Sequence, residues 1–117
     1  MYFKAFHDPA CVKNAPEFIP GKELLAETNR HWDWILYSET ITGIAGYCRE
    51  DSIIAEVRPE GEIWQFDKHL FYTDRLRVIK KLDAEEVFDI LRSESQMIHN
   101  KQWSSWTVRW LKEKLTE

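Results

Sequence analysis

Four histidines and two cysteines are the residues of this chain best suited to bind a metal ion or to act as nucleophile and base. They are His7, Cys11, His31, Cys48, His69 and His99. Structural zinc sites usually take their ligands in close pairs such as C-x2-C or H-x3-H. The nearest match is His7-x3-Cys11, and no second pair accompanies it. We therefore expect no metal site and no cofactor.

Nucleophilic catalysis would need a cysteine beside a histidine and an acid that orients it. His7-Asp8 or His31 with Asp33 could serve Cys11 or Cys48 if the fold brought them together. The chain contains no G-x-S-x-G, Walker or H-E-x-x-H motif, and its 4 glycines are too few for a phosphate-binding loop. A small enzyme or ligand-binding domain that uses His7, Cys11 or His31 in a cleft is therefore the alternative hypothesis.

The charge balance argues against a nucleic acid partner. The chain has 16 basic and 20 acidic residues and a net charge of -4, so no overall positive field attracts phosphates. The best basic cluster includes Arg75 and Arg77, which alternate along one face of a predicted strand beside acidic neighbours. We expect these two arginines to contact a protein partner.

Alternating apolar and polar residues predict the strands of a sheet. The strongest pattern runs over 53–58, where the turn residues Pro59-Glu60-Gly61 separate it from 62–66, and this predicts a hairpin. The other predicted strands are 2–6, 22–28, 32–37 and 75–80.

Helix signals fall in two places. Ser38 is the expected N-cap of a short helix over 39–47. Asp83, with Glu86 three residues on, forms a capping box, and Leu82 can pack against Val87 as a hydrophobic staple. The second pattern predicts a helix from Ala84 to about Arg92 that buries Val87, Phe88, Ile90 and Leu91.

The C-terminal segment, Lys101 to Thr116, is predicted to be a further helix. Trp103, Trp106 and Trp110 follow helical spacing on it. Together with the neighbouring leucines and valine they cover more than half of the circumference, which is wider than one packing contact needs. We expect at least one of the three tryptophans to contact a partner.

These elements predict an α+β fold in which a mainly antiparallel sheet is covered by two C-terminal helices, with residues 1–117 as a single domain. Its 44% hydrophobic and 14% aromatic residues suffice for a core. No secretory signal or apolar stretch of about 20 residues is found, so we expect a cytoplasmic protein without a membrane partner. In that compartment Cys11 and Cys48 are expected to be free thiols.

Short motifs resemble an uncharacterised domain of phage and prophage proteins. They are Lys4-Ala5-Phe6, Cys11, Phe18 and Gly21-Lys22, followed by the segments 53–63 and 73–82, so that the resemblance covers about residues 1–91. Members of that family usually carry a Cys- and His-containing stretch after the second strand, where this chain has Leu36 to Ile44. The resemblance implies a phage-related origin and fold more than an activity.

The abundant aromatic residues, the missing catalytic motifs and the phage resemblance together predict a non-enzymatic protein-binding module. Its partner would be a host protein or a second copy in a homodimer. One plausible instance is an inhibitor of a host defence complex, such as an anti-CRISPR protein, that acts by occluding a surface.

Overall fold

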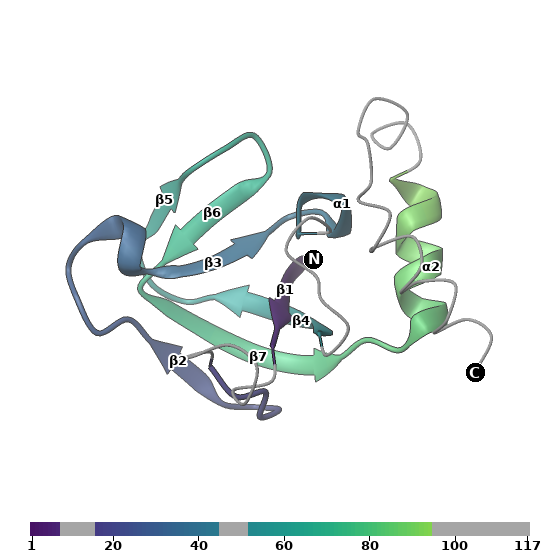
Figure 1. The fold of residues 1–117 in the computed structure, drawn as a ribbon, viewed down its shortest axis with the longest axis horizontal. Coiled ribbons are helices and arrows are strands. Elements are labelled where there is room, and N and C mark those ends of the chain that lie inside the picture. The colour runs from purple at the N-terminus through teal and green to yellow at the C-terminus, as the bar shows by residue number, and fades with distance from the viewer. Residues whose placement is uncertain (8–15, 45–51, 95–117) are drawn as a thin grey trace.

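The computed structural model describes residues 1–7, 16–44 and 52–94, which form one antiparallel sheet with helices packed on it (Figure 1). The strands are β1 (Tyr2–Phe6), β2 (Glu23–Leu25), β3 (Ile35–Ser38), β4 (Ile53–Pro59), β5 (Ile63–Gln65), β6 (Leu70–Thr73) and β7 (Arg75–Lys81). The helices are the 3-10 turn η1 (His31–Asp33), α1 (Ile41–Ile44) and α2 (Ala84–Ser93).

The α+β class with a mainly antiparallel sheet is confirmed. All pairings among the described strands are antiparallel, in the order β2-β7-β4-β1-β3-β6-β5. One of the two expected C-terminal helices is α2, and the other, over Lys101 to Thr116, lies outside the described residues. No helix in the described part of the chain is long and apolar enough to cross a membrane.

The predicted hairpin with its turn at Pro59-Glu60-Gly61 is wrong. β4 does not pair with β5; it pairs with β7, while β5 pairs with β6. The two arms of the actual hairpin are therefore 53–65 and 70–81, and its turn closes at Leu70, whose carbonyl accepts the amides of Phe66 and Asp67. β6, which no sequence pattern predicted, is the return strand at that turn.

Gly61 marks a kink in this long hairpin. A Cβ at Gly61 would collide with the Asp74 carboxylate, and it would approach the Arg75 backbone to 3.0 Å. The Asp74 side chain instead accepts the Glu62 amide at 2.8 Å. The glycine thus lets the first arm bend beside Asp74, which separates β6 from β7.

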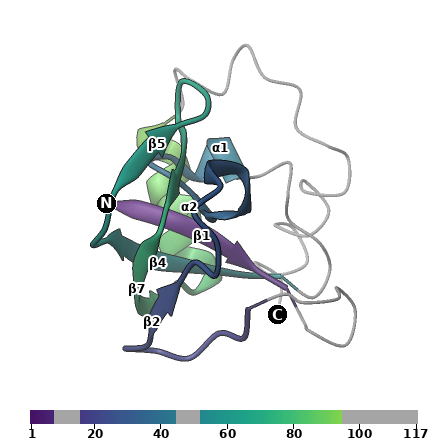
Figure 2. The same ribbon diagram turned by 90° about the vertical axis from the view of Figure 1, so that its left-hand side faces the viewer.

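β1 joins the two halves of the sheet by pairing with both β4 and β3 (Figure 1). One face carries Phe3, Ala5 and Ile54 and packs against Ile41 of α1 and Val87 of α2. Viewed from the β5 side, both helices lie behind the strands (Figure 2).

The opposite face of the sheet holds a second core. It consists of Phe6, Leu24, Tyr37, Ala55, Val57, Leu76 and Val78. Because successive side chains of a strand point to opposite faces of the sheet, β1 supplies Phe3 and Ala5 to the first core and Phe6 to the second. The predicted strands over 2–6 and 75–80 are confirmed.

The capping box that predicts α2 is also confirmed. The Glu86 amide donates to the Asp83 carboxylate at 2.8 Å, and the Asp83 amide donates to Glu86 at 3.4 Å. Leu82 and Val87 are both buried, as the staple requires. Leu91 is buried and Ile90 partly buried.

The strands β2 and β3 are shorter than the sequence predicts. The strand expected over 22–28 is limited to Glu23–Leu25. The strand expected over 32–37 begins only at Ile35, because Trp32 and Asp33 belong to η1, where the Trp34 amide donates to the His31 carbonyl.

The helix expected over 39–47 begins at Ile41, and Thr40 rather than Ser38 caps it. The Gly43 amide donates to Thr40 Oγ1 at 2.9 Å. Ser38 Oγ accepts the amide of Thr40, which precedes the first residue of the helix. The helix is described as far as Ile44, and the remainder of the predicted segment lies outside the described residues.

Candidate functional site: an aromatic surface

Five aromatic rings from three segments form a contiguous surface at the β5 edge of the sheet. They belong to His31, Trp34, Trp64, Phe66 and Tyr72, which we call the aromatic surface. Trp64 stacks on Tyr72 with ring centroids 5.6 Å apart, and the Phe66 ring meets Tyr72 at 5.5 Å. His31 lies 4.6 Å from Trp34 and 5.1 Å from Trp64. η1 is thereby joined to the β5–β6 arm.

Sheet register places these rings together. Trp64 is directly opposite Tyr72, and Leu36 of β3 is opposite Tyr72 on its other side, so all three side chains point to the same face. The Trp34 indole donates from Nε1 to the Thr28 carbonyl at 3.0 Å, which fixes its ring in a buried position. The surface therefore has an anchored inner ring.

The outer rings are exposed. Phe66 is 52% and Trp64 36% accessible, and the neighbouring Trp32 of η1 is 64% accessible. Figure 1 shows this end of the sheet on the side of the molecule away from α2. Contiguous exposed aromatic rings of this kind are typical of protein-binding sites, where Trp and Tyr contribute most to affinity.

Arg75 and Arg77, the arginines predicted to contact a partner, are engaged within the sheet. Arg77 donates to Glu60 at 2.8 Å and to Glu23 at 2.7 Å, and Arg75 lies 3.2 Å from Glu23. The hydrogen bond from Arg77 lowers the pKa of Glu60. These contacts join β2, β7 and the β4–β5 kink, and a role of the two arginines in partner binding stays a prediction.

The three tail tryptophans predicted to contact a partner, Trp103, Trp106 and Trp110, lie outside the described residues, as do Cys11, Cys48 and His99. Their predicted roles stay predictions.

The described histidines have separate surroundings. His7 lies 3.0 Å from Ser52 Oγ, at the start of β4, whereas His31 belongs to the aromatic surface. His69 Nδ1 lies 2.8 Å from a Glu39 carboxylate oxygen. In the ranges that the structure describes, no three metal-ligating side chains gather around a common point.

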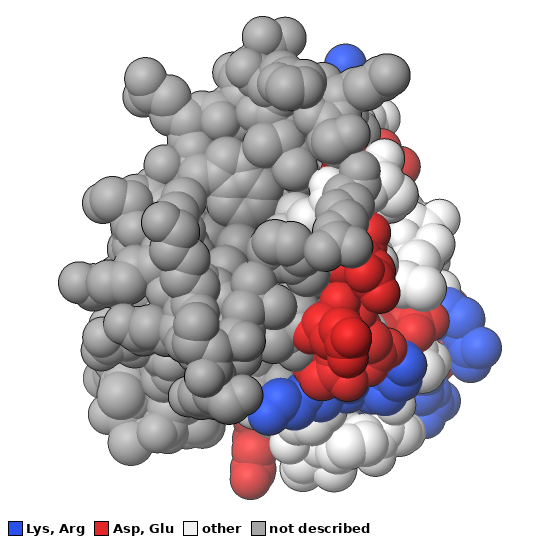
Figure 3. Space-filling model, turned by 90° about the vertical axis from the view of Figure 1, so that its right-hand side faces the viewer, with Lys and Arg blue, Asp and Glu red and all other residues white. Residues whose placement is uncertain are grey.

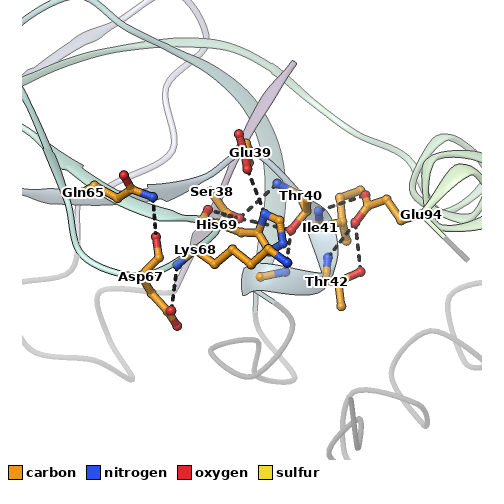
Figure 4. Close-up of polar contacts among 11 residues, drawn as sticks. Ser38, Glu39, Thr40, Ile41, Thr42, Gln65, Asp67, Lys68, His69 and Glu94 are labelled. Atoms are coloured by element: carbon orange, nitrogen blue, oxygen red, sulfur yellow. Dashed lines mark hydrogen bonds and ion pairs between the residues drawn. The ribbon is translucent and has the colours of Figure 1, made fainter. Parts of the chain in front are cut away.

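A polar network holds the start of α1 (Figure 4). The Glu94 carboxylate accepts the amides of Ile41 at 3.0 Å and Thr42 at 3.1 Å and the Thr42 hydroxyl at 2.9 Å. Ser38 Oγ donates to the His69 carbonyl at 2.9 Å. These hydroxyl and carboxyl groups satisfy backbone groups, so their role is to fix α1 on the sheet.

Charged side chains near α2 are of mixed sign. In Figure 3 acidic side chains gather beside basic ones on the described part of this face. Lys80 Nζ lies 2.6 Å from the Glu86 carboxylate. Since opposite charges neutralise each other here, the described residues of this face form no extended basic patch of the kind that binds nucleic acid.

Two titratable side chains lie at the second core. Lys4 donates from Nζ to the Leu36 carbonyl at 3.1 Å beside the Phe6 ring, and burial lowers its pKa to about 8. Burial likewise raises the pKa of Tyr37 to about 12. The Lys4 side chain occupies the place where β1 and β3 separate after the Phe3–Ser38 pair.

Sequence patterns did not identify the aromatic surface. One signal was available: Ile63, Trp64 and Phe66 put large apolar residues on both faces of a short strand. A strand that is covered on one face only would be expected to alternate with polar residues. The contributions of His31 and Tyr72 could not be read locally, because they depend on pairing between distant segments.

Comparisons with protein-family models, with curated proteins and with solved structures find no significant match to this chain.

Proposed function

We propose that this chain is a non-enzymatic protein-binding module and that the aromatic surface is its contact site. The observation that carries the proposal is the exposure of Trp64 and Phe66 in a cluster whose inner ring, Trp34, is buried and hydrogen-bonded. Rigid exposed rings lose little conformational entropy on binding and bury a large apolar area.

The partner class follows from the resemblance of 53–63 and 73–82 to phage and prophage domains. A phage-encoded binding module of this size would act on a host protein, and inhibition of a host defence complex, as by an anti-CRISPR protein, is the form we propose. The net charge of -4 is compatible with occlusion of a basic surface on such a complex.

The test compares tagged wild-type protein with Trp64→Ala and Phe66→Ala in quantitative affinity purification from host cells that carry an active CRISPR system. Leu25→Ala is the matched control, because Leu25 is 64% exposed on β2, at the opposite edge of the sheet. A component of the defence complex should be enriched by wild type and Leu25→Ala.

Either aromatic variant should bind this component roughly 30-fold more weakly, because the loss of a hot-spot ring costs about 2 kcal/mol of binding free energy. Melting temperatures within about 2 °C of wild type would show that the variants are folded. Equal enrichment by all four proteins would contradict the proposed role of the aromatic surface.

A further inference from the structure

The segments that carry the aromatic surface have an excess of acidic side chains. Residues 26–34 and 61–74 contain five acidic and two basic residues, which gives them a net charge of -3. The acidic ones are Glu27, Asp33, Glu62, Asp67 and Asp74, and the basic ones are Arg30 and Lys68. β3, which pairs with β6, adds no charged residue. A partner that covers this surface should therefore be positively charged.

The basic side chains around this surface are accompanied by acidic ones. Arg30 lies 3.0 Å from Asp33, and Lys68 directly follows Asp67 at the turn after β5. The arginines on the other side of the Gly61 kink already form ion pairs with glutamates; they are Arg58, Arg75 and Arg77. The excess negative charge thus remains on the other acidic residues of the two segments.

Two of these acidic residues border the stacked rings of Trp64 and Tyr72. Glu62 precedes Trp64 by two residues and Asp74 follows Tyr72 by two, an interval that puts side chains on the same face of a sheet, about 7 Å apart. The Asp74 carboxylate accepts the Glu62 amide at 2.8 Å, which holds the two residues together. Neither carboxylate forms an ion pair with another of the residues that the structure describes.

An arginine side chain fits this combination of a ring and carboxylates. Its planar guanidinium group stacks on an indole ring and donates paired hydrogen bonds to a carboxylate, whereas the ammonium group of lysine is compact and strongly hydrated. Trp64 is 36% accessible and Glu62 is exposed, so both can be reached from solvent. The 7 Å interval between them is within the reach of one arginine.

We infer that the aromatic surface binds an arginine side chain in a basic segment of its protein partner. The guanidinium group lies over the Trp64 ring, and its N–H groups donate to the carboxylates of Glu62 and Asp74. This inference rests on the proposed function, because it concerns the same surface, and it adds the chemical class of the segment that the surface recognises.

Peptide titrations of the full chain test this chemistry. One probe is a short acetylated and amidated peptide of alternating glycine and arginine, and the other carries citrulline, which has the shape of arginine without its charge. Nuclear magnetic resonance of the tryptophan indole N–H groups measures both affinities. The arginine peptide should bind roughly tenfold more tightly than the citrulline peptide, and Trp64→Ala should remove this preference. Because the two peptides are compared on wild type, this result does not depend on the folding of a variant.

A pair of isosteric variants locates the charge that matters. Glu62→Gln should weaken binding of the arginine peptide about fivefold, because one carboxylate beside Trp64 is lost. Asp67→Asn is the matched control, because it removes the same charge at the other end of β5 and keeps the side-chain oxygen that accepts the Lys68 amide. It should change the affinity by less than about twofold.

Three results would overturn the inference. They are equal affinities for the arginine and citrulline peptides, no binding of the arginine peptide up to about 10 mM, and equal losses in folded Glu62→Gln and Asp67→Asn. Melting temperatures within about 2 °C of wild type would show that both variants are folded.

Affinity purification from host cells separates this inference from the proposed function. If Trp64→Ala loses the host component while Glu62→Gln binds it as strongly as wild type, the arginine site is wrong and the proposed function stands. If the arginine peptide binds as expected but no host component depends on Trp64, the proposed function is wrong and the arginine site stands.

Discussion

The Glu94 side chain is expected to be among the most important polar groups for stability. Only 9% of Glu94 is exposed, and its carboxylate takes the first two amides of α1 together with the Thr42 hydroxyl. Glu94→Ala would leave the amides of Ile41 and Thr42 buried without an acceptor. Bonds to a charged group contribute about 1.5 to 3 kcal/mol each, and the desolvation of the carboxylate offsets part of the sum.

We therefore expect Glu94→Ala to lower the free energy of unfolding by about 3 kcal/mol. Glu94→Gln should lower the free energy of unfolding by about half as much, because the side-chain amide keeps one acceptor oxygen but brings an NH2 group toward a backbone donor. Thr42→Val, which removes only the hydroxyl bond, should cost about 1 kcal/mol.

Urea unfolding followed by tryptophan fluorescence measures these differences. Glu85→Ala is the matched control, since Glu85 is an exposed acid in the first turn of α2 and its loss should change stability by only about 0.5 kcal/mol. Hydrogen exchange at Ile41 and Thr42 reports on the site itself. The reasoning would be refuted if Glu94→Ala matched Glu85→Ala in urea and kept both amides protected.

Three further changes test other contacts. Lys4→Met should raise the free energy of unfolding at pH 7 by about 1 to 2 kcal/mol, because the buried ammonium costs more than its one hydrogen bond returns. The Lys4 pKa is lowered from 10.5 to about 8 in the fold, so wild type should gain stability as the pH rises between these values, and its difference in unfolding free energy from Lys4→Met should shrink. A difference that stays constant in urea titrations from pH 7 to 10 would contradict this. Asp83→Ala should cost about 1 kcal/mol through loss of the α2 cap, and a urea midpoint equal to that of wild type would place the cap elsewhere. Gly61→Ala should lower the melting temperature by several degrees, because the added Cβ would meet the Asp74 carboxylate and each kcal/mol lost corresponds to roughly 4 to 8 °C. Combining Gly61→Ala with Asp74→Ala should recover part of the lost melting temperature.

Local hydrogen bonds and side-chain alternation can be read from the sequence, and the elements that rely on them were predicted well. The α2 capping box lies within four consecutive residues, Asp83 to Glu86, so its geometry depends on little else. β1 and β7 likewise show their buried faces in the alternation of their own residues.

Contacts between distant residues decided the rest. A proline and glycine at 59–61 suit a hairpin turn, but the pairing of β4 with β7 and of β5 with β6 turns them into a kink and moves the turn to Leu70. The α1 amides find their acceptor in Glu94, which is 53 residues away from Ile41. No local pattern encodes that contact.

For the candidate site, too, one part could be predicted from the sequence and the other depends on the tertiary structure. The composition of the chain, rich in aromatic residues and without catalytic motifs, favours a binding protein, and that class could be proposed from the sequence. The location of the surface could not, because His31, Trp64 and Tyr72 meet only after β5 and β6 pair and η1 folds against them. Side-chain chemistry is a property of the sequence, whereas the convergence of separate segments at one edge is a property of the tertiary structure.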